Sequence, residues 1–93
     1  MAVLSDAEVT KALSALPKWK VEDGALTRTI QFPDFPDAVT FVNRLCPEAE
    51  KAGHHPDIDI RYNQVKLALV THDQGGITEK DLEMAKKLDD LQH

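Results

Sequence analysis

Apolar residues follow a helical period in three stretches of the chain. The first helix begins at the capping box Ser5-Asp6-Ala7-Glu8, because this pattern satisfies two free amides at a helix start. Its apolar run ends at Pro17. A broad apolar stripe predicts a second helix over residues 37–52, with a bend at Pro47. A third helix is expected after Gly75-Gly76, capped by Thr78 and carrying Asp81 in its first turn.

Strict alternation of apolar and polar residues predicts two β-hairpins between these helices. The first turns at Asp23-Gly24, a strong two-residue turn. The second is expected to turn at Asn63-Gln64, because that register opposes apolar residues on one face: Tyr62 to Val65, Ile60 to Leu67 and Ile58 to Leu69. Continued outward, the same register places His55 directly opposite His72, with β-carbons roughly 4.5–5.5 Å apart.

The predicted element order is therefore α-β-β-α-β-β-α. This order indicates an α+β fold in which a four-stranded antiparallel sheet carries three helices on one face. We expect one domain over residues 1–93, because 93 residues suit a single core.

Charge and composition exclude several classes of function. A net charge of −5 and a pI near 5.2 argue against direct nucleic-acid binding, which needs a basic surface. There is no apolar run of about 18 residues and no signal-peptide pattern, so we expect no membrane association. The single cysteine, Cys46, lies on the apolar stripe of the second helix and is expected in the core. These features together favour a cytoplasmic protein.

The segment from Glu50 to Pro56 carries the candidate chemistry. Gly53 is suited to end the second helix in a left-handed turn. His54 then lies just past the helix C-terminus, where the helix dipole favours the imidazolium that a general acid needs. Glu50 could reach the same region as an orienting carboxylate or a base. Pro56 holds His55 in an extended conformation, so the two imidazoles point in different directions.

The predicted hairpin register adds His72 to this pair, so three histidines would gather at one end of the sheet. Two other interpretations remain open. Exposed histidines are often solvated surface residues. Three histidines with a carboxylate also form a known catalytic zinc site, although adjacent residues in an extended segment point apart and make poor joint ligands. Asp81 could both cap its helix and border the pocket.

The chain resembles the pterin-4a-carbinolamine dehydratases over nearly its whole length. The resemblance rests on three motifs at fixed spacings: Glu50-x-x-x-His54-His55-Pro56, Tyr62-Asn63-x-Val65, and Thr71-His72-Asp73-x-Gly75-Gly76-Ile77-Thr78-x-x-Asp81. Trp19 and the Phe32-x-x-Phe35 segment also fit the family pattern. Two departures are Gly53, where the family often has an acidic or amide residue, and Ile58, where many members have tryptophan.

The resemblance implies a hydro-lyase that removes water from 4a-hydroxytetrahydropterin, as a 4a-hydroxytetrahydrobiopterin dehydratase does. The product is quinonoid dihydropterin, and the reaction recycles the pterin after an aromatic amino-acid hydroxylase has used it. Neither a metal nor an organic cofactor is implied. The implied catalytic residues are His54, His55, His72 and Glu50. The implied substrate-binding residues are Gly53, His54, His55, Pro56, Thr71, His72 and Asp73.

Our hypothesis for the roles makes His54 the leading acid, tuned by Glu50, and His72 the alternate acid or base. His55 would mainly bind and orient the pterin. The resemblance also implies a homodimer or homotetramer. Some family members act as a dimerisation cofactor for a homeodomain transcription factor. The alternative function is therefore a non-catalytic assembly or coactivator module with the same fold.

Overall fold

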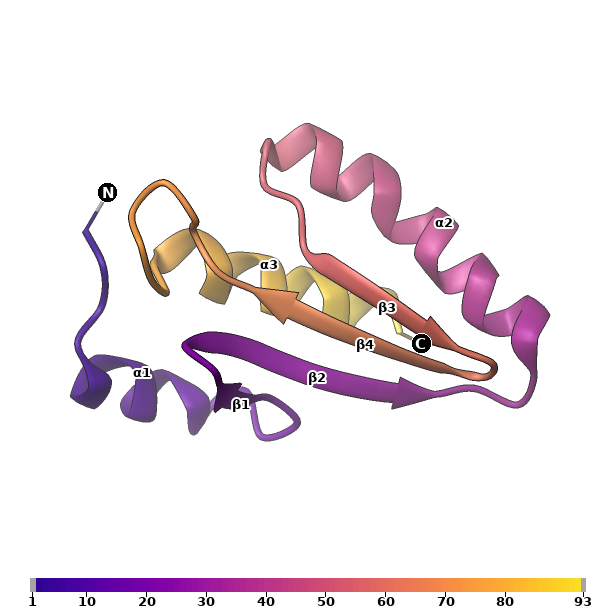
Figure 1. Ribbon diagram of the computed structural model, residues 1–93, viewed down its shortest axis with the longest axis horizontal. Coiled ribbons are helices and arrows are strands. Elements are labelled where there is room, and N and C mark those ends of the chain that lie inside the picture. The colour runs from indigo at the N-terminus through magenta and orange to yellow at the C-terminus, as the bar shows by residue number, and fades with distance from the viewer. Residues whose placement is uncertain (1, 93) are drawn as a thin grey trace.

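The computed structural model describes residues 2–92 (Figure 1). Its elements are α1 (Asp6–Leu13), β1 (Lys20–Glu22), β2 (Ala25–Gln31), α2 (Phe35–Ala52), β3 (Asp57–Arg61), β4 (Gln64–Leu69) and α3 (Glu79–Leu91). The strands form one antiparallel sheet in the order β1-β2-β4-β3. The predicted α+β fold and element order are confirmed.

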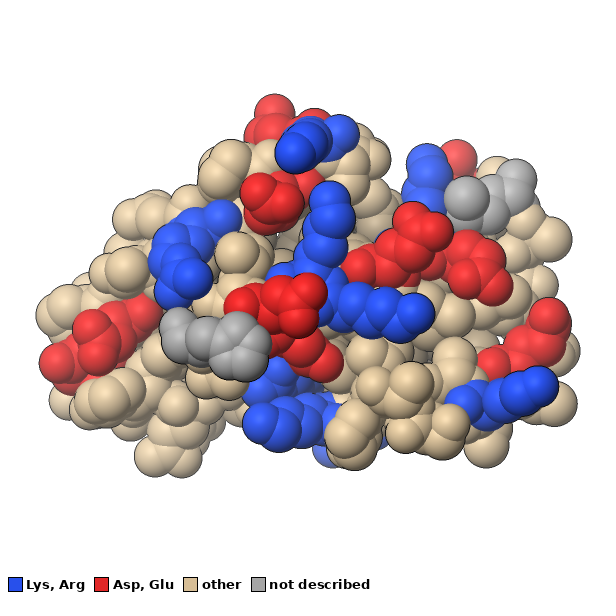
Figure 2. Space-filling model, turned by 180° about the vertical axis from the view of Figure 1, so that it is seen from behind, with Lys and Arg blue, Asp and Glu red and all other residues tan. Residues whose placement is uncertain are grey.

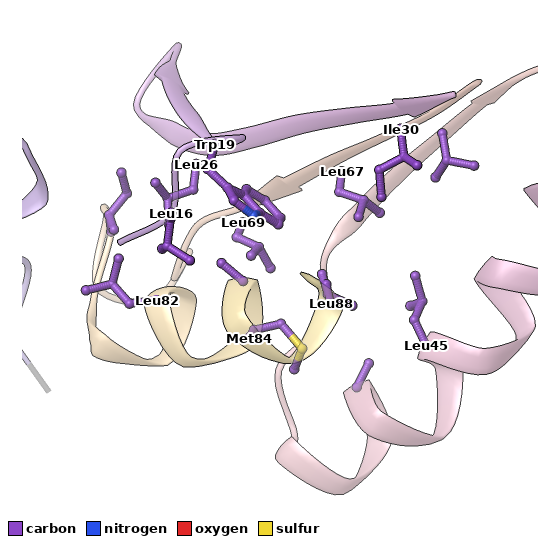
Figure 3. Close-up of a cluster of buried hydrophobic side chains, with 14 of the residues drawn as sticks. Leu16, Trp19, Leu26, Ile30, Leu45, Leu67, Leu69, Leu82, Met84 and Leu88 are labelled. Carbon is purple, nitrogen blue, oxygen red and sulfur yellow. The ribbon is translucent and has the colours of Figure 1, made fainter. Parts of the chain in front are cut away.

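The core lies between the sheet and the helices α2 and α3. Leu26 of β2 and Leu67 and Leu69 of β4 point from the sheet toward Leu88 of α3 (Figure 3), and all four side chains are fully buried. Leu45 brings α2 into the same cluster. Apolar packing on this face therefore holds the two central strands, β2 and β4, against the helices.

The helices begin where local hydrogen bonds satisfy their free amides. Ser5 and Glu8 form the predicted capping box at α1. Helix α2 begins at Phe35, two residues earlier than predicted, because the Asp34 carboxylate accepts a bond from the Asp37 amide. The helix continues through Pro47 as one element, as predicted.

One prediction about α2 is wrong, because Cys46 is exposed rather than buried. The helix contacts the core along a narrow stripe of residues spaced four apart, Phe41, Leu45 and Ala49. Successive residues of a helix differ by about 100° in direction. Cys46 is therefore turned away from the core, although its neighbour Leu45 is buried.

The register of the first hairpin is confirmed, but that of the second is wrong by two residues. Arg61 pairs with Gln64, so the turn consists of Tyr62 and Asn63, and Ile60 faces Val65. Asn63 is held in the turn because its side-chain amide donates to the Phe32 carbonyl at 2.9 Å. A shift of two residues leaves every side chain on its predicted face, because side chains alternate with a period of two.

The surface carries charges of both signs. Figure 2 shows lysine and arginine interspersed with aspartate and glutamate over one face of the molecule, without an extended basic area there. Among the helices within residues 2–92, none combines the length and apolar character that crossing a bilayer requires.

Candidate active site

Helix α2 ends in a Schellman motif that places His54 immediately beyond its C-terminus. Gly53 has a φ of +63°, in the left-handed region that favours glycine. The amide of Gly53 donates to the Glu50 carbonyl and that of His54 to the Ala49 carbonyl, both at 3.2 Å. The predicted role of Gly53 as helix terminator is confirmed. His54 therefore follows a fixed turn, close to the negative end of the helix dipole.

A buried carboxylate at the start of α3 fixes the ring of His54. Asp81 is 0% exposed, and its Oδ1 lies 2.5 Å from His54 Nε2. Its Oδ2 accepts hydrogen bonds from the Thr71 hydroxyl at 3.0 Å and from the Thr78 amide at 2.9 Å. An ionised carboxylate only accepts hydrogen bonds, so His54 Nε2 carries the proton of this contact. The remaining ring nitrogen, Nδ1, is the one left for other chemistry.

The second histidine has a different carboxylate partner. His55 Nε2 contacts Glu50 Oε2, and both side chains are exposed. The expectation that Glu50 tunes His54 is therefore wrong. The Schellman turn reverses the chain at Gly53, and Pro56 keeps His55 extended, so His55 points back toward Glu50 while His54 points toward α3.

The third histidine lies on the loop between β4 and α3. His72 Nε2 is 3.8 Å from Asp57 Oδ2, and both groups are solvent-exposed. The predicted direct pairing of His72 with His55 is wrong, since the observed register ends with Asp57 opposite Ala68. His72 reaches the site from the loop instead of from the ladder.

The three histidines line one hollow with a volume of about 320 Å³. Its lining consists of Gly53, His54, His55, Val70, Thr71, His72 and Asp73. Two predicted site residues are outside this lining: Pro56 is buried, and Glu50 reaches the area through its contact with His55. A larger hollow of about 470 Å³ lies beside the N-terminal segment and contains no histidine.

The sequence led us to expect Asp81 as a helix cap at the border of the pocket, but it did not predict the contact of Asp81 with His54 or that of Asp57 with His72. The signal for Asp81 was present, because Thr78-x-x-Asp81 is a capping box that fixes a carboxylate at the start of α3. Asp57 gave no comparable signal. Within residues 2–92, no group of three histidine, cysteine, aspartate or glutamate side chains is placed to share a metal ion.

The hollow has side chains that can transfer protons. His54 is largely buried, with 11% of its side chain exposed, and its ring is fixed by Asp81. His55 and His72 are open to solvent and reach the hollow from two different segments. An acid and a base that line the same hollow can act together on one substrate.

Comparisons with known proteins identify the family of the chain. Residues 2–91 match the family described as "Pterin 4 alpha carbinolamine dehydratase". A protein of Acidobacterium capsulatum named "Putative pterin-4-alpha-carbinolamine dehydratase" is 50% identical over 98% of this chain and 99% of its own length. A protein of Mycobacterium sp. (strain KMS) with the same name is 52% identical over 98% of this chain and 97% of its own.

Solved structures also share the fold. A crystal structure of a "transcriptional coactivator/pterin dehydratase" from Brucella melitensis superimposes with a TM-score of 0.91. It is 38% identical and covers 96% of this chain and 97% of its own. A pterin dehydratase-like protein described as a RuBisCO assembly factor superimposes with a TM-score of 0.63 at 22% identity, covering 78% of this chain and 84% of its own, which shows a shared fold. The chain therefore belongs to the pterin 4 alpha carbinolamine dehydratase family.

Proposed function

We propose that this protein dehydrates 4a-hydroxytetrahydropterin to quinonoid dihydropterin, as a step in the recycling of a pterin cofactor. The observation that carries the proposal is the convergence of His54, His55 and His72 on one hollow of about 320 Å³. Family membership supports the same substrate class. A hollow of this size is at the lower end of the range for small-molecule sites.

The reaction needs an acid and a base but no change of oxidation state. The bond between C4a and the hydroxyl oxygen breaks, and a protonated imidazole supplies the proton with which the hydroxyl leaves as water. The electron pair on N5 forms the new bond to C4a while the N5 proton passes to a base. Positioned groups of this kind each contribute about 10²–10⁴-fold to a rate.

The geometry supports His54 as the acid. Its Nε2 is committed to Asp81, so proton transfer to the substrate would use Nδ1. The buried carboxylate fixes the orientation of the ring, so that Nδ1 is held in one direction. His72 lies on the other segment of the hollow and would serve as the base, or as the acid when the hydroxyl is on the opposite face of the pterin.

His55 and Glu50 are assigned to binding. Their contact is exposed, so it is less suited to hold a catalytic group rigidly than the buried contact of His54 with Asp81. An imidazole oriented by a carboxylate can donate or accept a hydrogen bond at the rim of the hollow. We therefore place His55 against the polar edge of the pterin, with Glu50 as its orienting partner.

The direct test uses freshly generated 4a-hydroxytetrahydropterin. Purified protein should accelerate the appearance of quinonoid dihydropterin absorbance above the rate of a protein-free control. An unchanged rate with folded protein would contradict the proposal. It would favour the alternative of a non-catalytic assembly or coactivator module, which the description of the Brucella melitensis protein includes.

We also propose that the protein is a homo-oligomer whose copies meet at β3. This strand is at the edge of the sheet, and all five of its residues are exposed. Ile58 and Ile60 are 39% and 36% exposed, and Tyr62 in the adjoining turn is 70% exposed. An exposed edge strand with apolar side chains is a template for pairing with another chain. A second copy would bury these residues.

Sedimentation equilibrium tests this assembly. The wild-type mass should correspond to two or four chains, and Ile60→Lys should reduce it toward that of one chain. Asp59→Lys is the matched control, because residue 59 is on the other face of the same strand. A wild-type protein that sediments as a single chain would contradict this part of the proposal.

A further inference from the structure

The loop that carries His72 is closed at its two ends by backbone hydrogen bonds. The Thr71 amide donates to the Gly76 carbonyl at 2.9 Å, and the Gly75 amide donates to the Thr71 carbonyl at 2.9 Å. Gly75 has a φ of +78°, a conformation that favours glycine. Residues 72–75 are all exposed. The position of His72 therefore depends on how the two ends of this loop are fixed.

The Thr71 end is fixed by the network around Asp81. The hydroxyl of Thr71 lies 2.7 Å from that of Thr78 and donates to the Asp81 carboxylate. Both threonines are buried. This end of the loop is consequently rigid, and it is joined to the carboxylate that holds His54.

The Gly76 end is fixed by an N-terminal strap, which we define as Val3 and Leu4. The Leu4 amide donates to the Ile77 carbonyl at 2.8 Å. Val3 packs so closely that a β-carbon at Gly76 would lie 2.7 Å from Val3 Cγ1. A hollow of about 470 Å³ is lined by the strap, α1, Gly75 and Gly76. The strap therefore contacts the loop end at both Gly76 and Ile77.

We propose that the N-terminal strap is a positioning element for the reaction, because it holds Gly76 and Ile77 and thereby keeps His72 at the hollow. The strap lines the larger hollow but not the histidine-lined hollow of about 320 Å³, so it acts on His72 through the loop. This inference rests on the proposed dehydratase function. It predicts that substitutions at Val3 or Gly76, which do not line the histidine hollow, alter turnover because they displace His72.

The test is a steric swap between Gly76 and Val3. In Gly76→Ala, the new β-carbon would lie 2.7 Å from Val3 Cγ1, so Val3 must shift from its place against the loop. In the double variant Val3→Ala/Gly76→Ala, the obstructing Cγ atoms are absent, and the two β-carbons are 3.7 Å apart, an ordinary contact. An effect of alanine on the backbone at position 76 itself would not be reversed by shortening residue 3.

We expect Gly76→Ala to lower kcat/KM about tenfold, since small displacements of a catalytic group have large effects on rate. The double variant should recover to within about twofold of Val3→Ala alone. A wild-type kcat/KM in Gly76→Ala would overturn the inference. A loss of activity that the Val3→Ala change does not rescue would also overturn it.

A second measurement does not require the protein to be catalytically active. The ring-proton NMR signals of His72 should move in Gly76→Ala and return in the double variant, while those of His54 stay in place. If wild-type protein does not turn over 4a-hydroxytetrahydropterin, the proposed function fails, and this NMR comparison alone decides whether the strap positions His72. If the His72 signals do not move in Gly76→Ala, the strap does not position His72.

Discussion

The Asp81 carboxylate is fully buried, and its hydrogen bonds come from three separate parts of the chain. His54 follows α2, Thr71 follows β4, and Thr78 precedes α3. A buried charge of this kind is costly unless every lone pair is satisfied. Asp81 therefore joins the two histidine-bearing segments, and we assign it the role of positioning residue for His54.

Replacing Asp81 by asparagine should reduce kcat about 10²-fold, because one carboxylate oxygen becomes an N–H donor and the hydrogen bonds that orient His54 are disrupted. Thermal or urea unfolding should show a loss of about 1–3 kcal/mol, since buried hydrogen bonds are weakened. Asp90→Asn, an exposed carboxylate on the same helix, is the control and should change neither quantity. A kcat equal to wild type in Asp81→Asn would remove the positioning role.

Glu50→Gln should affect substrate binding more than turnover. Its contact with His55 is exposed, and exposed ion pairs contribute little, so KM should rise only about two- to fivefold with kcat nearly constant. The control is Glu48→Gln, which lies one half-turn away on α2 and contacts Lys87 instead. Steady-state kinetics on both variants separates the two effects; a large fall in kcat for Glu50→Gln would show that Glu50 does more than orient His55.

The histidines themselves could be singled out from the sequence, but their partners could not. The motif around Gly53 indicated where His54 and His55 would lie. Whether Glu50 contacts His54 or His55 depends on the direction in which the chain leaves the Schellman turn, and residue spacing does not determine that direction. The contact of His72 with Asp57 similarly depends on the exact path of a loop, for which residue spacing gives no rule.

At the scale of the elements, the turns decide how well the sequence predicts geometry. The Asp23-Gly24 turn was recognisable, and its register was confirmed. In the second hairpin, Asn63 was placed one position too early in the turn, because its bond to the Phe32 carbonyl is a tertiary contact. The apolar pattern could not reveal the error, since a shift of two residues preserves the faces of the sheet.

Gly53→Ala tests the turn that ends α2. A φ of +63° is unfavourable for alanine by about 1–2 kcal/mol, while no other atom lies within 4 Å of the new β-carbon. We expect the free energy of unfolding to fall by that amount and the activity to fall with it, because His54 follows the strained residue. Urea denaturation with parallel kinetics would check both; unaltered stability would contradict the left-handed turn.

The capping box of α1 predicts a specific dependence of stability on pH. The pKa of Glu8 is lowered from 4.5 by hydrogen bonds from Ser5, first its backbone amide and then its hydroxyl contact. Because the folded pKa lies below the unfolded one, the stabilisation is present above the unfolded pKa and is lost as the pH falls through the folded pKa. The stability difference between wild type and Glu8→Gln should thus be largest near neutral pH and shrink in acid. A difference that stays constant down to about pH 3 would contradict it.

At the scale of the whole molecule, the core and the site are separate. The packed leucines lie between the sheet and the helices (Figure 3). The hollow is instead lined by the segments that follow α2 and β4. Hydrophobic periodicity therefore sufficed to predict the layers. The site is formed by segments between the regular elements, where periodicity carries no information and individual hydrogen bonds determine position.

This separation allows the central claim to be tested with the leucine core intact, because none of the three histidines belongs to that core. The claim is that imidazoles from two segments act together on one substrate. The decisive measurement is kcat for dehydration in His54→Ala, His72→Ala and the double variant. We predict that each single change lowers kcat by about 10²-fold or more, and that the double variant is much less impaired than the product of the two effects, since groups that act as a unit are not additive. Wild-type turnover in both single variants would contradict the account.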